Sequence, residues 1–153
     1  MKDVLKAIAV IGFGVAIYFA IMNSFEPTLK KAKEAYLNKN YGKAIELYKE
    51  IAISNNKDKK EKMDSQFILG SIYAIGIGVE QDYEEAFKWY NLSANQGLAE
   101  AQNELATLYL KGRGTKKDVK EAFEWYSLSA NQENAKAQFN MGKLLFATKE
   151  YKE

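Results

Sequence analysis

Apolar residues recur every three or four positions along two neighbouring stretches in the middle of the chain, 63–75 and 82–95. Such spacing places the apolar side chains on one face of a helix, so the pattern predicts two amphipathic helices joined by a loop. Asp82 is the first residue of the second stretch and is expected to cap the N-terminus of that helix. The positions predicted to be buried are Phe67, Leu69, Gly70, Ile72 and Tyr73 in the first helix, and Ala86, Phe87, Tyr90 and Ala94 in the second.

The same pattern occurs a second time, 36 residues later. Residues 65–96 and 101–132 are identical at 16 of 32 positions, and both contain "LSANQ" and the pattern A-F-x-W-Y. A period of about 20 to 50 residues indicates a repeat architecture, in which stacked units bury a continuous core. The repetition therefore predicts at least two equivalent helix pairs.

Two kinds of residue within the repeated text invite a functional interpretation. Trp89 and Trp125 stand at helical spacing from the small residues of the buried stripe, so we expect them to pack against the core and not to stack on a ligand. The Gly-x-Gly pairs at 76–78 and 112–114 are expected to supply positive φ angles in the loops, and not to cradle a phosphate.

The segment "LGSIYAIGIGVEQDYEEAFKWYNLSANQG" (69–97) resembles the Sel-one-like repeat (SLR), a longer-looped relative of the tetratricopeptide repeat (TPR). It carries the marks L-G-x-x-Y, G-x-G-V-x-x-D-Y, A-x-x-W-Y and A-x-x-G. The second copy departs from them modestly, at Ala106, Thr115, Val119 and Glu133. The resemblance implies an all-α fold, namely an α-solenoid of antiparallel helix pairs (an SLR/TPR-like superhelix).

The two flanks are similar to TPR units instead, because their loops are four residues shorter. Ala32 to Tyr41 spans nine residues, whereas Gly70 to Tyr83 spans 13. The expected organisation is a TPR-like unit at 29–56, SLR units at 63–97 and 99–133, and an incomplete terminal TPR-like unit at 135–153. In that last unit either a partner covers the apolar residues or the chain is a truncated copy of a longer array; these residues are Phe139, Met141, Leu144, Leu145 and Phe146.

An apolar segment precedes the repeats. Residues 7–25 are a run of 19 uncharged residues behind a short tail at 1–6. As a helix, this run would be about 28 Å long, close to the roughly 30 Å of a bilayer core. We expect an uncleaved transmembrane signal-anchor helix. The alternatives are a buried core helix and a cleaved signal peptide, although Met22 stands where a signal peptide prefers a small residue.

The orientation and pairing of this segment are also open to prediction. Lysines flank it in nearly equal number, and we expect a single-pass protein of the bacterial inner membrane with its N-terminus inside and its repeats exported. Gly12, Ala16 and Ala20 form a small-residue stripe on one face, which would let two copies approach closely as a homo-oligomer. The alternative is that Gly and Ala are simply common in membrane helices.

The composition excludes several kinds of catalytic and metal-binding site. The 153-residue chain has a formal net charge of +2 and contains no cysteine and no histidine. These absences exclude disulfides, the usual ligands of zinc, and catalytic triads built on His or Cys. The near-neutral charge does not indicate a nucleic-acid partner. No cofactor, metal site or catalytic residue is predicted.

One short sequence motif is compatible with an enzymatic function. Ser54 and Lys57 form S-x-x-K, a pattern of penicillin-recognising serine enzymes, and some cysteine-rich exported SLR proteins carry a β-lactamase label. Neither S-D-N nor K-T-G occurs in the chain, and the cysteines of that subgroup are missing. An exported β-lactamase-type hydrolase is therefore the alternative to the expected function.

The resemblance also implies a binding surface, because in the family the first helices of the pairs line a concave groove for partner peptides or domains. Carried over to this chain, the groove has three rungs of equivalent positions: Asp64, Glu100 and Lys136; Phe67, Asn103 and Phe139; Ser71, Thr107 and Lys143. Exposed aromatic rings beside polar side chains would suit an extended peptide or a helix. The alternative is that Phe67 and Phe139 are core residues between neighbouring repeats.

These expectations combine into one function. The chain is expected to be a membrane-anchored adaptor or scaffold that binds an unknown protein or peptide partner. A secreted binding protein is the alternative if the apolar segment is cleaved.

Overall fold

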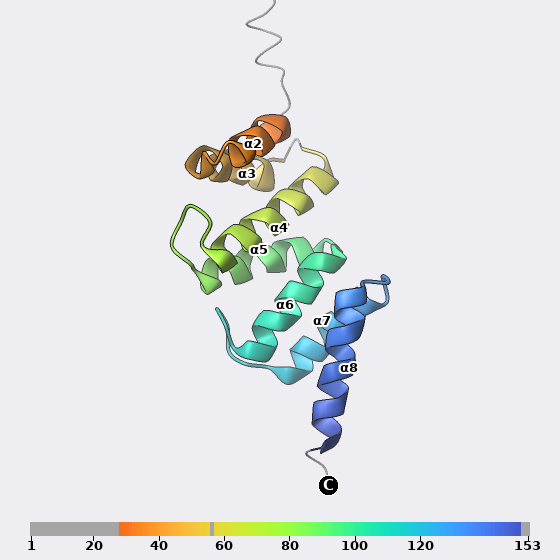
Figure 1. The fold of residues 1–153 in the computed structure, drawn as a ribbon. Helices are drawn as coiled ribbons and strands as arrows, with labels where there is room; N and C mark the ends of the chain where they lie inside the picture. The colour runs from red at the N-terminus through yellow and green to blue at the C-terminus, as the bar shows by residue number, and fades with distance from the viewer. Residues whose placement is uncertain (1–27, 56, 151–153) are drawn as a thin grey trace, which may run out of the picture.

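The computed structural model describes residues 28–55 and 57–150, and the regular secondary structure of these residues is entirely helical. The helices are α2 (Thr28–Leu37), α3 (Tyr41–Ile53), α4 (Lys59–Ile75), α5 (Tyr83–Asn95), α6 (Ala99–Lys111), α7 (Val119–Ala130) and α8 (Ala135–Glu150) (Figure 1). The predicted membrane segment 7–25, with its stripe of Gly12, Ala16 and Ala20, lies outside the described residues. Within the described ranges, no helix has the length and apolar character needed to cross a bilayer.

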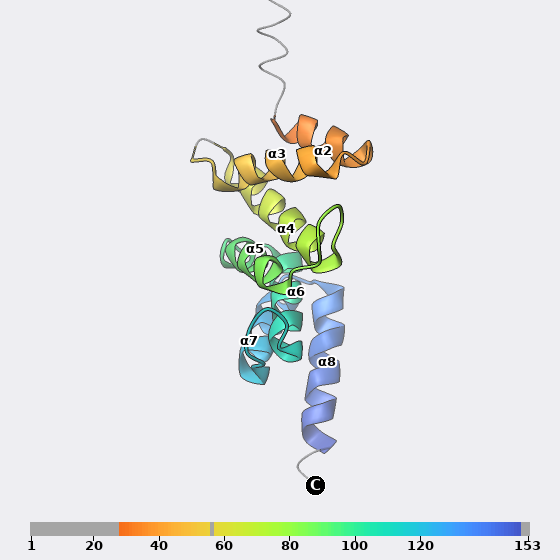
Figure 2. The ribbon, with the colours of Figure 1, turned by 90° about the vertical axis from the view of Figure 1, so that its left-hand side faces the viewer.

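The helices stack in the order of the sequence. Each one makes its substantial contacts with the helix before it and the helix after it, from α2 through to α8. Two views at right angles show the result as an elongated stack with α2 and α3 at one end and α8 at the other (Figures 1 and 2). The predicted all-α solenoid of helix pairs is confirmed, and its repeated contacts are local in the sequence.

The hydrophobic core follows the stack as three clusters. The first centres on Ile51 and Leu69 and joins α2, α3 and α4. The second includes Tyr90 and Leu105, and the third includes Tyr126 and joins α6, α7 and α8. Trp89 and Trp125 are partly buried and pack against these clusters, as the helical spacing predicted.

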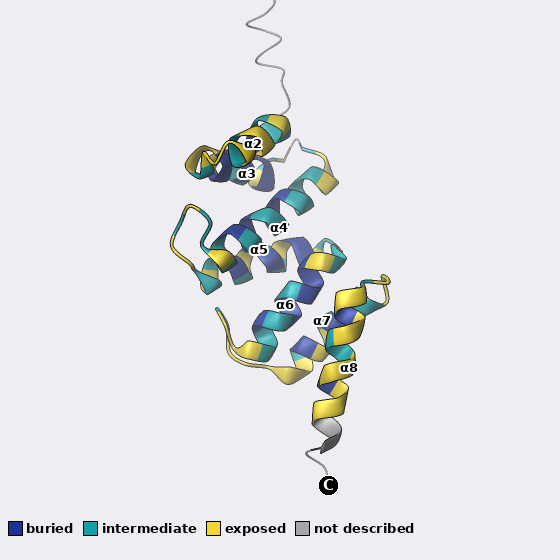
Figure 3. Ribbon diagram, in the orientation of Figure 1, coloured by how far each residue is buried: buried dark blue, intermediate teal, exposed yellow. Residues whose placement is uncertain are grey.

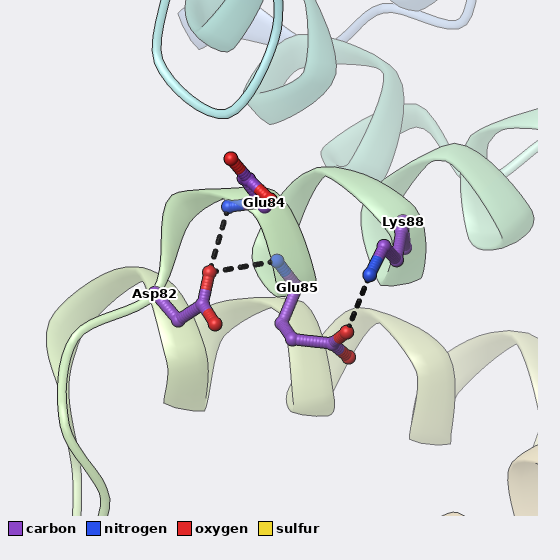
Figure 4. A network of polar contacts seen from close by, with 4 residues as sticks. All are labelled: Asp82, Glu84, Glu85 and Lys88. Atoms are coloured by element: carbon purple, nitrogen blue, oxygen red, sulfur yellow. Dashed lines mark hydrogen bonds and ion pairs between the residues drawn. The ribbon is translucent and has the colours of Figure 1, made fainter.

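Aspartates cap three of the helices: Asp58 for α4, Asp82 for α5 and Asp118 for α7. In Figure 4 one carboxylate oxygen of Asp82 accepts from the backbone N–H of Glu84 at 2.9 Å and of Glu85 at 3.0 Å. These bonds satisfy amides that have no partner inside the helix, so the predicted cap is confirmed. Helix α4 begins at Lys59 and not near residue 63, because Asp58 caps the charged segment that precedes the apolar stripe.

The Gly-x-Gly loops adopt positive φ, as predicted: Gly76 82°, Gly78 72°, Gly112 63° and Gly114 69°. The second glycine of each pair has a further role, because it lies against the preceding unit. A Cβ on Gly78 would overlap the side chain of Tyr41, and one on Gly114 would overlap the backbone carbonyl of Tyr83. The loops are therefore part of the contact between units as well as the turn within one.

A buried serine ties the two helices of each SLR unit together. Ser93 Oγ donates to the carbonyl of Met63 at 2.8 Å, and 36 residues later Ser129 Oγ donates to the carbonyl of Ala99 at 2.6 Å. Both serines have no exposed surface. The serine of "LSANQ" thus bonds the end of the second helix to the beginning of the first.

Glutamines join successive units. The side-chain amide of Gln66 donates to the carbonyl of Ala52, in the preceding unit, at 3.0 Å, and Gln102 makes the equivalent bond from α6 to α5 at 3.2 Å. The amides of Gln96 and Gln132 donate in turn to the side-chain oxygens of Gln66 and Gln102. The repeated text therefore encodes a hydrogen-bond network in addition to the apolar stripe.

Candidate partner-binding groove

A groove of about 570 Å³ runs between α6 and α8, the first helices of two successive units, with Tyr126 of α7 at its side. Both helices present side chains to it because residues three or four apart share a helix face. The structure brings five of the nine predicted groove residues together here: Asn103, Thr107, Lys136, Phe139 and Lys143.

The floor of the groove is polar and hydrogen-bonded. Asn103 is buried, its oxygen accepts from the side-chain amide of Asn140 at 3.0 Å, and its own amide donates to Glu104 at 3.0 Å. The hydroxyls of Thr107 and Tyr126 lie 2.9 Å apart. Burial raises the pKa of Tyr126, so the phenol remains neutral and able to share that bond over the physiological range. The floor is thus pre-organised by contacts between α6, α7 and α8.

The rim of the groove is aromatic and cationic. Phe139 is 67% exposed, and Lys143 Nζ lies 5.6 Å from the centroid of its ring. Lys136 is also exposed, one turn earlier on α8. A large exposed apolar ring beside two cations can anchor a partner that offers both apolar surface and negative charge.

Phe67 and Phe139 are equivalent in sequence but differ in environment. Phe67 is partly buried, packs with the second core cluster and lies 5.7 Å, centroid to centroid, from the ring of Tyr90. The expectation of two exposed aromatics is therefore wrong for Phe67, because α5 covers it. Phe139 has no such cover, and the core interpretation does not describe it.

The other predicted rung residues do not line this groove. Ser71 Oγ donates to the carbonyl of Phe67 at 3.0 Å and accepts from the hydroxyl of Tyr90 at 3.1 Å, within its own unit. Asp64 is partly buried in the second turn of α4, and Glu100 is exposed in the first turn of α6. Sequence reasoning also missed lining residues, although helical spacing from the predicted rungs would have found them: Glu104, Leu110, Lys111 and Asn140.

The S-x-x-K motif does not lie at this groove. Ser54 is the C-cap residue of α3, and its backbone N–H donates to the carbonyl of Ile51. Neither Ser54 nor Lys57 contributes to the lining of the groove between α6 and α8. Among the residues that the structure describes, no group of three or more His, Cys, Asp or Glu side chains is arranged to hold a metal ion.

The fold and the groove define a class of protein, an α-solenoid built from repeated helix pairs. The model of the Sel1 repeat family matches residues 34–56, 64–98, 99–134 and 135–147, and the chain belongs to this family. Proteins with Sel1 repeats generally mediate protein–protein interaction and are mostly non-enzymatic modules. Comparison with curated protein sequences finds no match.

Two solved structures are similar to this chain. One is a Sel1 repeat protein from Oxalobacter formigenes, with 36% identity and a TM-score of 0.64 over 74% of this chain and 44% of that one. The other is a protective antigen of uropathogenic Escherichia coli that displays an SLR fold, with 28% identity and a TM-score of 0.58 over 78% of this chain and 29% of that one. The chain therefore spans less than half the length of either relative.

Proposed function

We propose that this protein is a membrane-anchored adaptor that binds a partner protein or peptide in the groove between α6 and α8. The observation that carries the proposal is the exposure of Phe139, a residue that is 67% exposed at the groove rim. Exposing a phenylalanine ring loses roughly 1.5 to 3 kcal/mol of burial free energy, and a partner that covers the ring recovers it. The polar floor beneath it supplies donors and acceptors that fix the register of the partner.

Membrane anchoring is the second part of the proposal, and it is supported by the apolar run at 7–25. The anchor would hold the repeats outside the bacterial inner membrane, with Gly12, Ala16 and Ala20 available for pairing of two anchors. Mass spectrometry of the mature N-terminus and a phosphatase fused after Glu153 test this part. We expect an intact N-terminus and an active phosphatase. A new N-terminus beyond the run would instead indicate a secreted binding protein, and an inactive phosphatase would place the repeats inside.

Site-specific photocrosslinking of the full chain in cells tests the groove. A photoreactive residue replaces Lys136 at the rim or, as the matched control, Lys88, an exposed lysine of α5 whose side chain is 63% exposed. We expect a discrete adduct from position 136 that does not form from position 88. The substitution Phe139→Ala should remove the adduct without changing the circular dichroism spectrum. The same adducts from both positions, or an adduct that persists in Phe139→Ala, would contradict the proposal.

A further inference from the structure

One face of α8 is open over residues 138–147. Six residues of this helix line a groove of about 550 Å³ on it: Gln138, Phe139, Gly142, Lys143, Phe146 and Ala147. Phe146 is 66% exposed, about as much as Phe139. Figure 3 shows α8 as the helix with the most continuous exposed surface, in contrast to α4 and α6.

The internal repeat identifies what covers this face elsewhere. Gln138 and Lys143 of α8 are equivalent to Gln102 and Thr107 of α6, which lie 36 residues earlier. The oxygen of Gln102 accepts from Gln132 at 2.8 Å, and the hydroxyl of Thr107 bonds to a tyrosine of α7 at 2.9 Å. In the complete units, therefore, the face that α8 leaves open is occupied by the second helix of the pair.

The most detailed match is with α4. Phe67 and Gly70 of α4 hold the ring of Tyr90, because the two aromatic centroids are 5.7 Å apart and a Cβ on Gly70 would come 2.5 Å from Tyr90 Cδ1. Helix α8 repeats the pair as Phe139 and Gly142, at the same spacing of three residues. A Cβ on Gly142 would meet no atom within 4 Å. The site that receives a tyrosine ring in the second unit is thus present and open on α8.

Charge distinguishes α8 from the earlier first helices. Lys136 takes the place of the acidic residues Asp64 and Glu100 of the earlier units. Lys143 takes the place of the hydroxyl-bearing Ser71 and Thr107. Lys143 lines the open face, so two α8 helices facing each other would bring two copies of this lysine together, which disfavours pairing with a second copy. An acidic helix would instead be attracted, and a tyrosine hydroxyl could accept from the Lys143 ammonium where Tyr90 bonds to Ser71.

We infer that the open face of α8, centred on Phe139, Gly142 and Lys143, is the docking site for an acidic amphipathic helix of a partner protein. The helix carries a tyrosine four residues after an alanine, the spacing of Ala86 and Tyr90. Its alanine and tyrosine pack on the open glycine, and its negative charge faces Lys143. The inference rests on the proposed function, since it states the chemistry of the partner.

A synthetic peptide copying residues 82–97 is the probe for this site. It holds three acidic residues and one lysine, which gives a net charge of −2, and it contains the tyrosine and the alanine at the required spacing. Binding to the full chain in mild detergent is measured by fluorescence anisotropy. Gly142→Leu should weaken binding at least about tenfold, because its side chain fills the site. A Tyr90→Ala peptide should lose as much affinity, and Lys143→Glu should weaken binding at least about threefold.

The matched control is Gly42→Leu, since Gly42 of α3 is also a helical glycine with no atom within 4 Å of an added Cβ. This variant should bind the peptide like the wild type, and neither leucine variant should have a lowered melting temperature. Undiminished binding to Gly142→Leu, equal weakening by Gly42→Leu, or the absence of saturable binding to the wild type would overturn the inference. Self-association that Gly142→Leu abolishes in sedimentation would also overturn it, in favour of a second copy.

The outcomes separate this inference from the proposed function. If the peptide does not bind but the crosslink from position 136 still forms, only the inference of a helix docking site on α8 is contradicted. If the peptide binds and Gly142→Leu weakens that binding, but position 136 forms no adduct, only the proposed partner binding in the groove between α6 and α8 is contradicted.

Discussion

The ring of Tyr90 lies directly on the backbone of Gly70: a Cβ added to this glycine would stand 2.5 Å from Tyr90 Cδ1 and 2.9 Å from Cγ. The ring cannot swing aside freely, because its hydroxyl is hydrogen-bonded to Ser71 at 3.1 Å. This contact sets how closely α4 and α5 approach. In the next unit Ala106 occupies the place of Gly70 and is fully buried with Tyr126 in the third cluster, so the corresponding pair accommodates one more methyl group.

Gly70→Ala should therefore destabilise the protein by about 1 to 3 kcal/mol, because the added methyl overlaps the ring and forces the two helices apart. Urea unfolding followed by circular dichroism measures the change. Gly142→Ala is the control, since it adds the same methyl to a first helix where no atom lies within 4 Å. That variant should be unchanged or up to about 1 kcal/mol more stable, owing to the higher helix propensity of alanine. Equal effects of the two substitutions would contradict the argument.

Ser129→Ala should lower the free energy of unfolding by about 1 kcal/mol, because it removes the buried hydrogen bond that ties α7 to the carbonyl of Ala99. Chemical denaturation is again the measurement. Ser127→Ala provides the comparison, since Ser127 Oγ bonds at 2.8 Å to the carbonyl of Phe123 within the same helix. We expect Ser127→Ala to lower the free energy of unfolding by less than about 0.5 kcal/mol. The prediction fails if Ser127→Ala is the more costly of the two.

Gly114→Ala should cost more than Gly112→Ala, although both glycines have positive φ, at 69° and 63°. The backbone conformation costs roughly 1 to 2 kcal/mol in either variant. At Gly114 the new methyl would also overlap the carbonyl of Tyr83 and push the third unit away from the second. Thermal unfolding of the two variants should show the lower melting temperature for Gly114→Ala. The opposite order would mean that the loop does not hold the units together.

Stability should fall in strong alkali because of Tyr90. Burial raises the pKa of Tyr90 from 10.0 to about 12, and the hydrogen bond from its hydroxyl to Ser71 offsets this only in part. A raised pKa means that the folded state holds the proton more tightly than the unfolded state. The corresponding stability is fully present below pH 10 and is lost as the pH rises to about 12, at roughly 1.4 kcal/mol per pH unit.

Tyr90→Phe tests this directly, because it removes the titrating group and keeps the ring. Between pH 10 and 12 the free energy of unfolding should fall less steeply in the variant than in the wild type. Absorbance titration of the phenols supplies a second measurement, in which the variant lacks one late-titrating tyrosine. Identical slopes for the two proteins would show that Tyr90 ionises as freely in the folded as in the unfolded state.

Much of the fold could be predicted from sequence, because the features concerned depend on residues close to one another in the chain. The stripe of Ala86, Tyr90 and Ala94 follows from helical spacing alone, and all three are buried. The cap at Asp82 and the positive φ of Gly76 involve only their immediate neighbours. The apolar stripe predicts a start of α4 near residue 63, four residues too late, because the charged residues that follow Asp58 carry no such stripe.

The groove could be predicted only in part. Helical register identifies Asn103 and Phe139 as equivalent positions on two first helices, and the structure places both at one groove. Register does not show that Asn103 is buried and bonded to Asn140 of the next unit, while Phe139 remains 67% exposed. Those environments depend on which helices cover each position, and the covering helices lie about a repeat away in sequence.

The sequence by itself determined the repeat period, the pairing of helices within each unit and the absence of cysteine and histidine chemistry. It did so because a repeated pattern of side chains places the same groups at the same helical positions in every unit. Only the tertiary structure decided which copy of a position is buried and which is exposed. Burial is set by the helices that pack on each position, so Phe67 packs beneath α5 whereas its equivalent Phe139 stands open on α8.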